Sequence, residues 1–445
     1  MAQSLNPDDL PDPEAAEPVF ENTQVESAKP SEQIVARRPS ADRLQSETGA
    51  EDPVVLAKPG PGLLEAMLWT ISVLIVHVFA GLFTIFAVYF LSSENPRELL
   101  AVLQDPNQFQ QFIDTYMVEI TAGDMGIFSA VVLLAVILRL GLRADRRLML
   151  TRIPTFHTVL ILCSFLPMSL LCGQLHLWAK AGWDRLVELA PILRYFSMTD
   201  TMDAIQPLAE SASLPTLILI LGVAPAISEE LVFRGVIGRG LVARFGIVPG
   251  ILLTSILFGA VHLHPAHAVA LFPLAVMIHL AYLATRSFWA PVLIHFLNNS
   301  FAAVVLKLPH DDDVSAIASE SELPLAVTIS AAVSCVCAGI LLWRSRMQWK
   351  LPDGDIWSPG FETVEAPPAD LQAVPERRRV STVCFVVAAV GIIQFGIFFG
   401  AHAVSVARTE RERIDSKASQ PTQEPDVKTK PEPVGRPISP LLTDG

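Results

Sequence analysis

Two adjacent carboxylates and an arginine follow an apolar run, in the order Glu229-Glu230-x-x-x-Arg234. Residues 214–223, just before them, are almost wholly apolar, as is typical of a membrane helix. Each ionised side chain near a bilayer centre costs about 2.5–3.5 kcal/mol on insertion scales, so their presence favours a function. Glu230 and Arg234 are one helical turn apart and can pair, whereas Glu229 points about a quarter turn away and is the candidate for chemistry. For the pair, the alternative is a salt bridge at the membrane boundary whose side chains reach water.

Imidazole and amide side chains occur in the apolar runs that follow. His262 ends the stretch Phe258-Gly259-Ala260-Val261-His262, and His295-x-x-x-Asn299 lies inside a later run. His295 and Asn299 are four residues apart, so they share one helix face. The non-catalytic alternatives are an interfacial histidine at position 262 and a hydrogen-bonded pair that joins two helices at 295 and 299. His279 stands alone in its run and is predicted to be a packed or helix-bridging histidine.

These side chains could activate water in two ways. Glu229, His262 and His295 are a known catalytic zinc set, with one position left open for water. Without metal, Glu229 and His262 could remove a proton from water, while His295 and Asn299 donate hydrogen bonds to a developing oxyanion. Both routes end in attack of water on a carbonyl. Neither includes a nucleophilic Ser or Cys with partners, which disfavours a covalent acyl-enzyme.

The composition predicts that these side chains are positioned by membrane helices. Hydrophobic residues make up 51% of the chain and charged residues 17%, against about 25% charged in soluble domains. The fold class predicted is an all-α, polytopic membrane helix bundle with about eight core spans and one extra C-terminal span. The predicted spans are residues 63–91, 126–142, 156–178, 214–233, 247–262, 266–284, 289–306, 323–343 and 380–404.

The sequence also predicts how the chain is divided. In order, we expect a disordered acidic tail (1–59), membrane helices and loops (60–212), the core helices that carry the candidate site (213–306), the eighth span (307–350), a polar linker (351–379), the extra span (380–405) and a disordered tail (406–445). Arginines at 139, 143, 146, 147 and 152 indicate a cytoplasmic loop, which also places the N-terminal tail in the cytoplasm. Basic residues flank the extra span on both sides, so its orientation stays open. We expect a multi-pass protein of the plasma (inner) membrane.

Charge and cysteine content exclude two further classes. The formal net charge of −13 argues against nucleic acid as a partner, since that would need a basic face. All five cysteines lie in apolar runs and read as small buried hydrophobes. No zinc knuckle or disulfide framework is visible in their spacing.

Taken together, Glu-Glu-x-x-x-Arg, Phe-x-x-x-His and His-x-x-x-Asn on successive spans resemble the CPBP family. This family comprises the CAAX prenyl endopeptidases and the bacteriocin-processing, Abi-type intramembrane proteases. The similar stretch runs from about Leu214 to Leu306. The resemblance implies an eight-helix membrane core, a site in a cavity open to one leaflet and to water, and hydrolysis of peptide bonds in membrane-embedded or lipidated substrates.

Residue by residue, the resemblance implies that Glu229 is the catalytic carboxylate and that Glu230 and Arg234 support it. His262 matches the histidine of the second motif. His295 and Asn299 match the third. Whether zinc takes part is left open by the resemblance as well as by the residues.

Two other functions are compatible with the same residues. Some proteins of this kind act without shown proteolysis, so a membrane scaffold or bacteriocin-immunity protein is one alternative. A secondary transporter is another, because intramembrane carboxylates and histidines also carry protons. The sequence shows no pair of matching halves of the kind that transporters often have.

Overall fold

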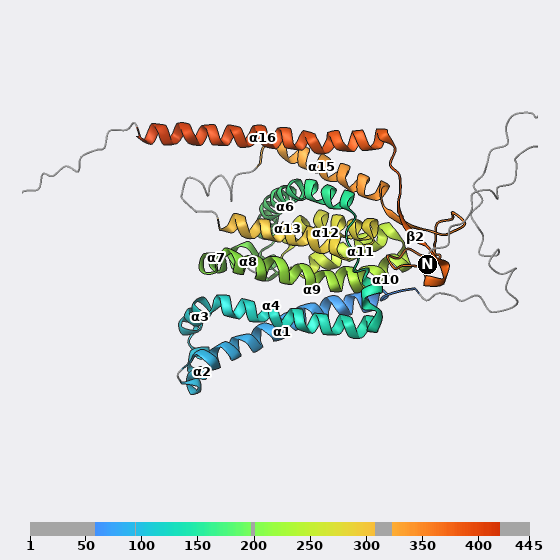
Figure 1. The fold of residues 1–445 in the computed structure, drawn as a ribbon. Coiled ribbons are helices and arrows are strands. Elements are labelled where there is room, and N and C mark those ends of the chain that lie inside the picture. The colour runs from blue at the N-terminus through green and yellow to red at the C-terminus, as the bar shows by residue number, and fades with distance from the viewer. Residues whose placement is uncertain (1–57, 94, 197–200, 308–322, 419–445) are drawn as a thin grey trace, which may run out of the picture. The chain divides into compact units, whose positions relative to one another are not determined.

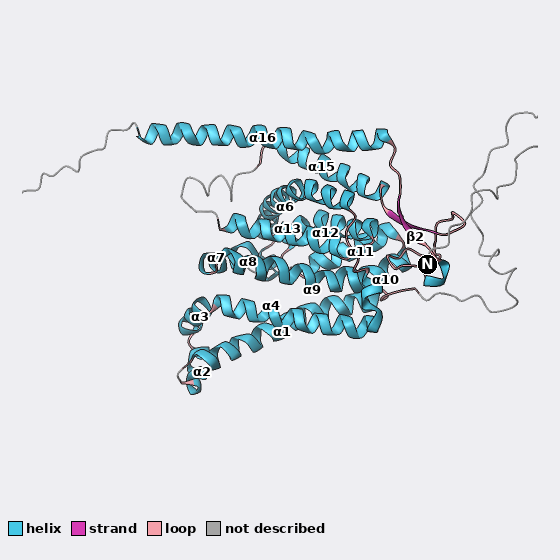
Figure 2. Ribbon diagram, in the orientation of Figure 1, coloured by secondary structure: helices cyan, strands magenta, loops and turns pink. Residues whose placement is uncertain are grey.

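The computed structural model describes residues 58–93, 95–196, 201–307 and 323–418. The N-terminal tail predicted to be disordered lies almost wholly outside the described residues, as do residues 419–445 of the C-terminal one. Residues 406–418, predicted to be disordered, instead continue the last helix, so the prediction was wrong there. Within the described residues, helices dominate and there is one small pair of strands (Figure 2). The all-α membrane class is confirmed.

The helices and strands have the following bounds: α1 Leu63–Ser92, α2 Leu99–Gln104, α3 Pro106–Thr115, α4 Met117–Leu140, α5 Ala144–Leu148, α6 Thr155–Leu189, α7 Thr201–Ser211, α8 Leu214–Leu217, α9 Ala224–Val232, α10 Arg239–Phe245, α11 Ile247–Ala260, α12 Pro265–Thr285, α13 Trp289–Leu306, α15 Leu325–Arg344, β1 Met347–Lys350, β2 Val374–Arg377 and α16 Thr382–Ala418.

Eight helices in the described part of the chain are long and apolar enough to cross a membrane. The sequence had indicated nine segments, and the difference is the predicted fifth span. That segment forms α11, which has only 14 residues. At 1.5 Å per residue it is about 21 Å long, shorter than the roughly 30 Å hydrocarbon core of a bilayer. The second span also begins earlier than predicted, at Met117 instead of residue 126.

The span that carries the carboxylates is not a uniform α-helix. Between α8 and α9 lies a π-helical segment, Ile218–Val223, and a second one, Phe233–Gly238, joins α9 to α10. Such wider turns are often found at functional sites because they rotate the side chains that follow. Glu229 and Glu230 lie on the α-helical stretch between the two π segments.

The helices differ in how much of their surface other helices cover. In Figure 1, α1 and α4 run side by side along one edge, α15 and α16 run together along the other, and α6, α9, α12 and α13 lie between. The most apolar window of α1, α4 or α16 is 17% buried, against 61% for α12. The outer helices therefore present apolar side chains outward, as membrane lipid requires, and the inner helices form the core.

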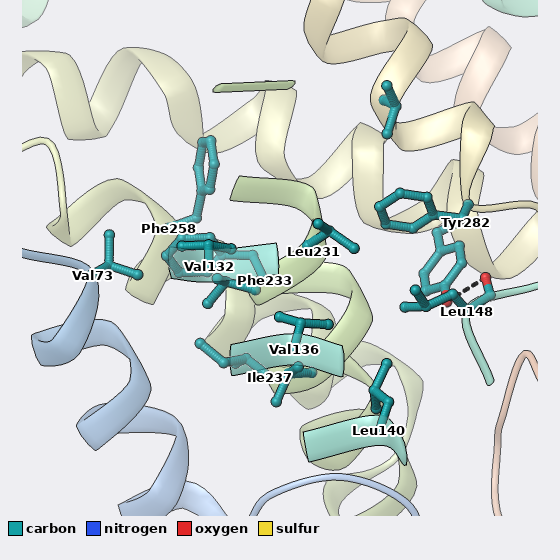
Figure 3. Packing of buried hydrophobic residues seen from close by; sticks show 14 of the residues in the cluster. Val73, Val132, Val136, Leu140, Leu148, Leu231, Phe233, Ile237, Phe258 and Tyr282 are labelled. Carbon is teal, nitrogen blue, oxygen red and sulfur yellow. Dashed lines mark hydrogen bonds between the residues drawn. The ribbon is translucent and has the colours of Figure 1, made fainter. Parts of the chain in front are cut away.

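The main apolar cluster lies between α1, α4, α9 and α11, beside the carboxylates. Phe233 and Phe258 meet edge to face there, with ring centroids 5.2 Å apart. Figure 3 shows these two rings close to Val132 of α4 and Val73 of α1. At the end of the cluster, the Tyr282 hydroxyl donates to the Leu148 carbonyl, at 3.0 Å. This packing holds α9 against α4, and the π-helical segment that follows α9 against α11.

The segment predicted to be a polar linker is folded onto the bundle. Its strand β2 pairs antiparallel with β1, with Met347 opposite Arg377. Val364 is buried in the main apolar cluster, and Glu365 forms an ion pair with Arg239 of α10. Arg286, in the turn between α12 and α13, donates to the carbonyls of Met347 and Thr363, at 3.0 Å each, and burial lowers its pKa to about 10. The linker thus covers the end of the bundle that carries α10.

Candidate active site

The predicted ion pair is present and completely buried. Arg234 Nη1 donates to Glu230 Oε1 at 2.8 Å, and neither side chain is exposed to solvent. Arg234 Nη2 donates to the Ala275 carbonyl of α12, at 2.9 Å. His295 Nδ1 of α13 donates to the same oxygen of Glu230, at 2.8 Å. The pair therefore joins three helices inside the protein and is not a boundary salt bridge that reaches water.

The ring of Phe258 lies between the two predicted catalytic histidines. The guanidinium of Arg234 lies 4.8 Å from its centroid, in a cation–π contact. The ring of His295 meets that of Phe258 edge to face at 5.8 Å between centroids, and the ring of His262, in the turn after α11, lies 5.2 Å from it. Gly259 allows α11 to pack closely on α12, because a Cβ at this position would lie only 3.3 Å from the Ala268 carbonyl oxygen. The first two motifs and the third thus meet around one aromatic ring.

Glu229 differs from its neighbour in having no such partners. It is only partly buried, and its Oε2 is shielded from solvent without a hydrogen-bond partner among the described residues. It is near enough to His295 of α13 and to His77 of α1 for an electrostatic interaction with each. A carboxylate with an unused acceptor atom is suited to bind and deprotonate a water molecule.

His262 lies in the turn that follows α11. Its Nδ1 donates to the Phe258 carbonyl at 3.0 Å, and its ring stacks on that of His267, with centroids 5.0 Å apart. A carbonyl only accepts, so the proton of the neutral ring sits on Nδ1, and Nε2 carries the lone pair. His262 is thereby set to accept a hydrogen bond through Nε2.

Asn299 has a structural partner on the helix of the carboxylates. Its Nδ2 donates to the Leu221 carbonyl at 2.9 Å. In an α-helix that carbonyl would accept from the N–H of residue 225, but residue 225 is a proline and has none. The amide of Asn299 therefore satisfies an acceptor that Pro225 leaves open, and it joins α13 to the π-helical segment. One N–H of the amide remains for another acceptor.

The side chains proposed for zinc do not fit a metal ion as they are placed. Across the described ranges, no group of three or more His, Cys, Asp or Glu side chains lies close enough to hold one. His295 directs Nδ1 to Glu230, and His262 directs Nδ1 to a backbone carbonyl. Both bonds leave Nε2 uncommitted, as in histidines that bind a metal through one ring nitrogen and donate from the other, so the misfit to an ion rests on the separation of the side chains alone.

His279 is packed, as predicted. It is buried in α12 against Gly238, where a Cβ would lie 2.4 Å from its Cε1 atom.

Two further ionisable residues in membrane helices were missed by the sequence interpretation. His77 of α1 and Asp124 of α4 lie 3.4 Å apart, from Nδ1 to Oδ2. His77 stands four residues after Val73 and three before Ala80, both buried, so helical spacing could have placed it on the inner face. Asp124 lies two residues before the predicted start of the second span, so the sequence interpretation did not place it in a helix. The available signal was an acidic residue just before the apolar run that begins at residue 126.

Comparison with known proteins defines the class. Residues 211–301 match the sequence model of the family described as type II CAAX prenyl endopeptidase Rce1-like. All six predicted site residues lie in the matched stretch, and the resemblance inferred from the motifs is confirmed over it. The chain is an integral membrane protein that carries a CAAX-endopeptidase-like segment, which supports a membrane protease in general.

Among individual proteins, this chain is similar to one from Bacillus subtilis (strain 168) described as "Putative membrane peptidase YdiL". The two are 25% identical over 93 residues, which are 21% of this chain and 38% of that relative. The similarity thus spans well under half of the relative's length. No solved structure matches the chain.

Proposed function

We propose that this protein is an intramembrane endopeptidase that hydrolyses peptide bonds in membrane-embedded or lipidated substrates of the CAAX type. The observation that carries the proposal is the contrast between two adjacent carboxylates in one membrane span. Glu230 is fully buried and paired with Arg234, whereas Glu229 is partly exposed and has an oxygen without a partner. An unpaired carboxylate inside a membrane helix costs stability, so its presence favours a functional role.

In the proposed mechanism, Glu229 removes a proton from water and His262 accepts a hydrogen bond from the same water through Nε2. Both side chains are partly exposed, so water can reach them, although Oε2 of Glu229 is itself shielded and would be met from within the site. General-base catalysis of this kind contributes about 10²–10⁴-fold in rate. The hydroxide that forms attacks the carbonyl carbon of the substrate.

The oxyanion that develops would then be stabilised from α13. The Nδ1 bond of His295 to Glu230 fixes the ring, and because that bond uses the Nδ1 proton, Nε2 donates to the oxyanion only when the ring carries a second proton. Asn299 uses one N–H for Leu221 and has a second one to donate. Loss of a single oxyanion donor typically costs about 10²–10³ in kcat. The Glu230–Arg234 pair serves to hold α9, α12 and α13 in register around this site.

A substrate in the plane of the bilayer suits the exposed apolar faces of the outer helices. A lipidated peptide would remain among the lipid chains while its backbone reaches the polar side chains between the helices. The membrane we expect, the plasma (inner) membrane, is part of the proposal and can be tested by cell fractionation.

The test is turnover of a quenched, farnesylated peptide by the purified protein in liposomes. Glu229→Gln keeps the shape of the side chain and removes the base, so we expect turnover to fall about 10²-fold or more. Glu65→Gln is the matched control, because Glu65 forms an exposed ion pair with Arg139, and such pairs contribute little. Equal turnover by Glu229→Gln and the unmodified protein would exclude the mechanism.

The role of metal is tested in the same assay. Because the three candidate ligands do not fit an ion as placed, we expect chelator treatment to leave turnover unchanged. A loss of turnover on chelation that added zinc restores would contradict the metal-free route. Absence of any turnover by the unmodified protein would favour the scaffold or immunity alternative.

A further inference from the structure

The pair formed by His77 and Asp124 lies outside the residues used above. On α1, the buried stripe runs through Val73 and Ala80, and His77 occupies the turn between them. On α4, Asp124 lies one turn before Phe128, the first of the buried residues of that helix. Both side chains therefore project from the inner faces of helices whose outer faces are apolar. Ionisable groups in such places are retained for a function far more often than for stability.

The imidazole of His77 is fixed in orientation. It stacks on the ring of Phe128, with centroids 3.7 Å apart and planes at 18°. Its Nδ1 donates a long hydrogen bond to Asp124, 3.4 Å away, and the ring places Nε2 on the opposite edge. Asp124 Oδ1 is buried and has no partner in the described part of the chain. A carboxylate on Nδ1 holds a histidine in the orientation and charge state needed for proton transfer from Nε2.

The pair is close to the proposed site. His77 is near enough to Glu229 and to His262 for an electrostatic interaction with each. Val73, one turn before His77, packs in the same apolar cluster as Phe258, and Figure 3 shows the two close together. Helix α4 also packs directly against α9, the helix of Glu229. The groups that act on His77 from its neighbours are thus Asp124 on α4, Glu229 on α9 and His262 after α11.

Hydrolysis of an amide needs a proton donor as well as a base, since an amine leaves poorly without a proton. His295 is nearly fully buried and donates to a carboxylate that Arg234 already neutralises. His262 donates to a neutral carbonyl. His77 instead faces a carboxylate that has no arginine or lysine partner among the described residues, and its side chain is 29% exposed. It is the imidazole best placed to carry a positive charge and to meet a bound peptide.

We propose that His77, oriented by Asp124, is the proton donor to the leaving amine, an assignment that rests on the proposed function. Water gives a proton to Glu229, and its oxygen bonds to the carbonyl carbon. The C–N bond then breaks, and the nitrogen keeps the electron pair and takes a proton from Nε2 of His77. The products are a carboxylic acid and an amine, and the proton on Glu229 returns to His77 through water.

Two substrates with one peptide sequence separate this role from a structural one. The first has the ordinary scissile amide, and the second has an activated aryl ester at that bond, whose phenolate leaves without a proton. For His77→Gln and for Asp124→Asn we expect kcat on the amide to fall about 10²-fold or more, with little change on the ester. His402→Gln is the matched control, since His402 lies on the outer helix α16.

The outcomes are distinct. A loss confined to the amide supports the proposal. Equal losses of kcat on amide and ester would overturn it, because a purely structural role would lower kcat on both substrates alike. No loss of kcat on the amide would overturn it as well. Glu229→Gln should lose turnover on both substrates. If the unmodified protein cleaves neither, the proposed function itself fails, and the role of His77 falls with it.

Discussion

Two groups of ionisable side chains lie inside the membrane helices, and they differ in charge balance. The closed network consists of Glu230, Arg234 and His295, in which one guanidinium balances one carboxylate and none of the three is more than slightly exposed. The open group consists of Glu229, His77, Asp124 and His262, with two carboxylates and no arginine or lysine, and all four are partly exposed.

The difference indicates how a membrane protein can separate stability from reactivity. Charges that are buried and paired, such as those of Glu230 and Arg234, hold helices together and are not available to a substrate, whereas His295 commits only its Nδ1 edge to the network. Charges that lack partners cost stability and are available. The ring of Phe258 contacts His295 of the closed network and His262 of the open group, so the two groups adjoin at this residue.

The largest effect on stability is expected at Arg234, in the closed network. Arg234→Leu leaves Glu230 buried without a counter-charge, which typically costs 3–5 kcal/mol, so we expect a loss of about 4 kcal/mol. Reversible unfolding in mixed detergent micelles measures it. The double variant Glu230→Leu/Arg234→Leu removes both charges and should be more stable than the single one. A double variant as unstable as Arg234→Leu would show that lost packing, and not the unbalanced charge of Glu230, causes the loss of stability.

A smaller effect is expected at Phe258, between the two groups. Phe258→Leu keeps an apolar side chain but removes the cation–π contact with Arg234, which is worth about 2 kcal/mol when desolvated. The same unfolding assay measures the loss. Phe395→Leu on α16, which stacks on Phe399 and contacts no charged group in the described structure, is the matched control. Equal losses of unfolding free energy in the two variants would show that the cation–π contact does not contribute to stability.

A still smaller effect is expected at Asn299, which joins the two helices that carry the groups. Asn299→Ala removes the bond to the Leu221 carbonyl, and interhelical bonds of this kind contribute about 1 kcal/mol. The cost should shrink in a Pro225→Ala background, because an N–H at position 225 can then satisfy that carbonyl. A double-mutant cycle measures the coupling, and a coupling of zero would contradict the structural role given to Asn299.

These expectations depend partly on features that were readable from the sequence. Long apolar runs predicted the membrane helices, since only helices satisfy the backbone in lipid. The four-residue spacing predicted that Glu230 and Arg234 would pair and that Glu229 would not. These features are local, and helical periodicity alone determines them.

Contacts between helices were not readable in the same way. Nothing in the spacing of His295 indicates that it bonds to Glu230, since the two are 65 residues apart and meet only through packing. The π-helical segments have no periodic signature, so the link from Asn299 to the carbonyl freed by Pro225 could not be predicted. The polar residues before Asp124 hid the start of α4, so Asp124 fell outside the predicted span and His77 lacked a visible partner.

The smallest effect on stability is expected at Glu229, in the open group. Glu229→Gln removes a partly buried charge that has no partner, so the unfolding free energy should change by less than about 1 kcal/mol, toward greater stability, as is common where function maintains an unfavourable group. The unfolding assay used for Arg234→Leu gives the comparison directly. A loss of several kcal/mol at Glu229 would mean that it has a structural partner after all, and the distinction between the two groups would no longer hold. Stability retained with turnover lost is the result that assigns the two adjacent carboxylates to different tasks.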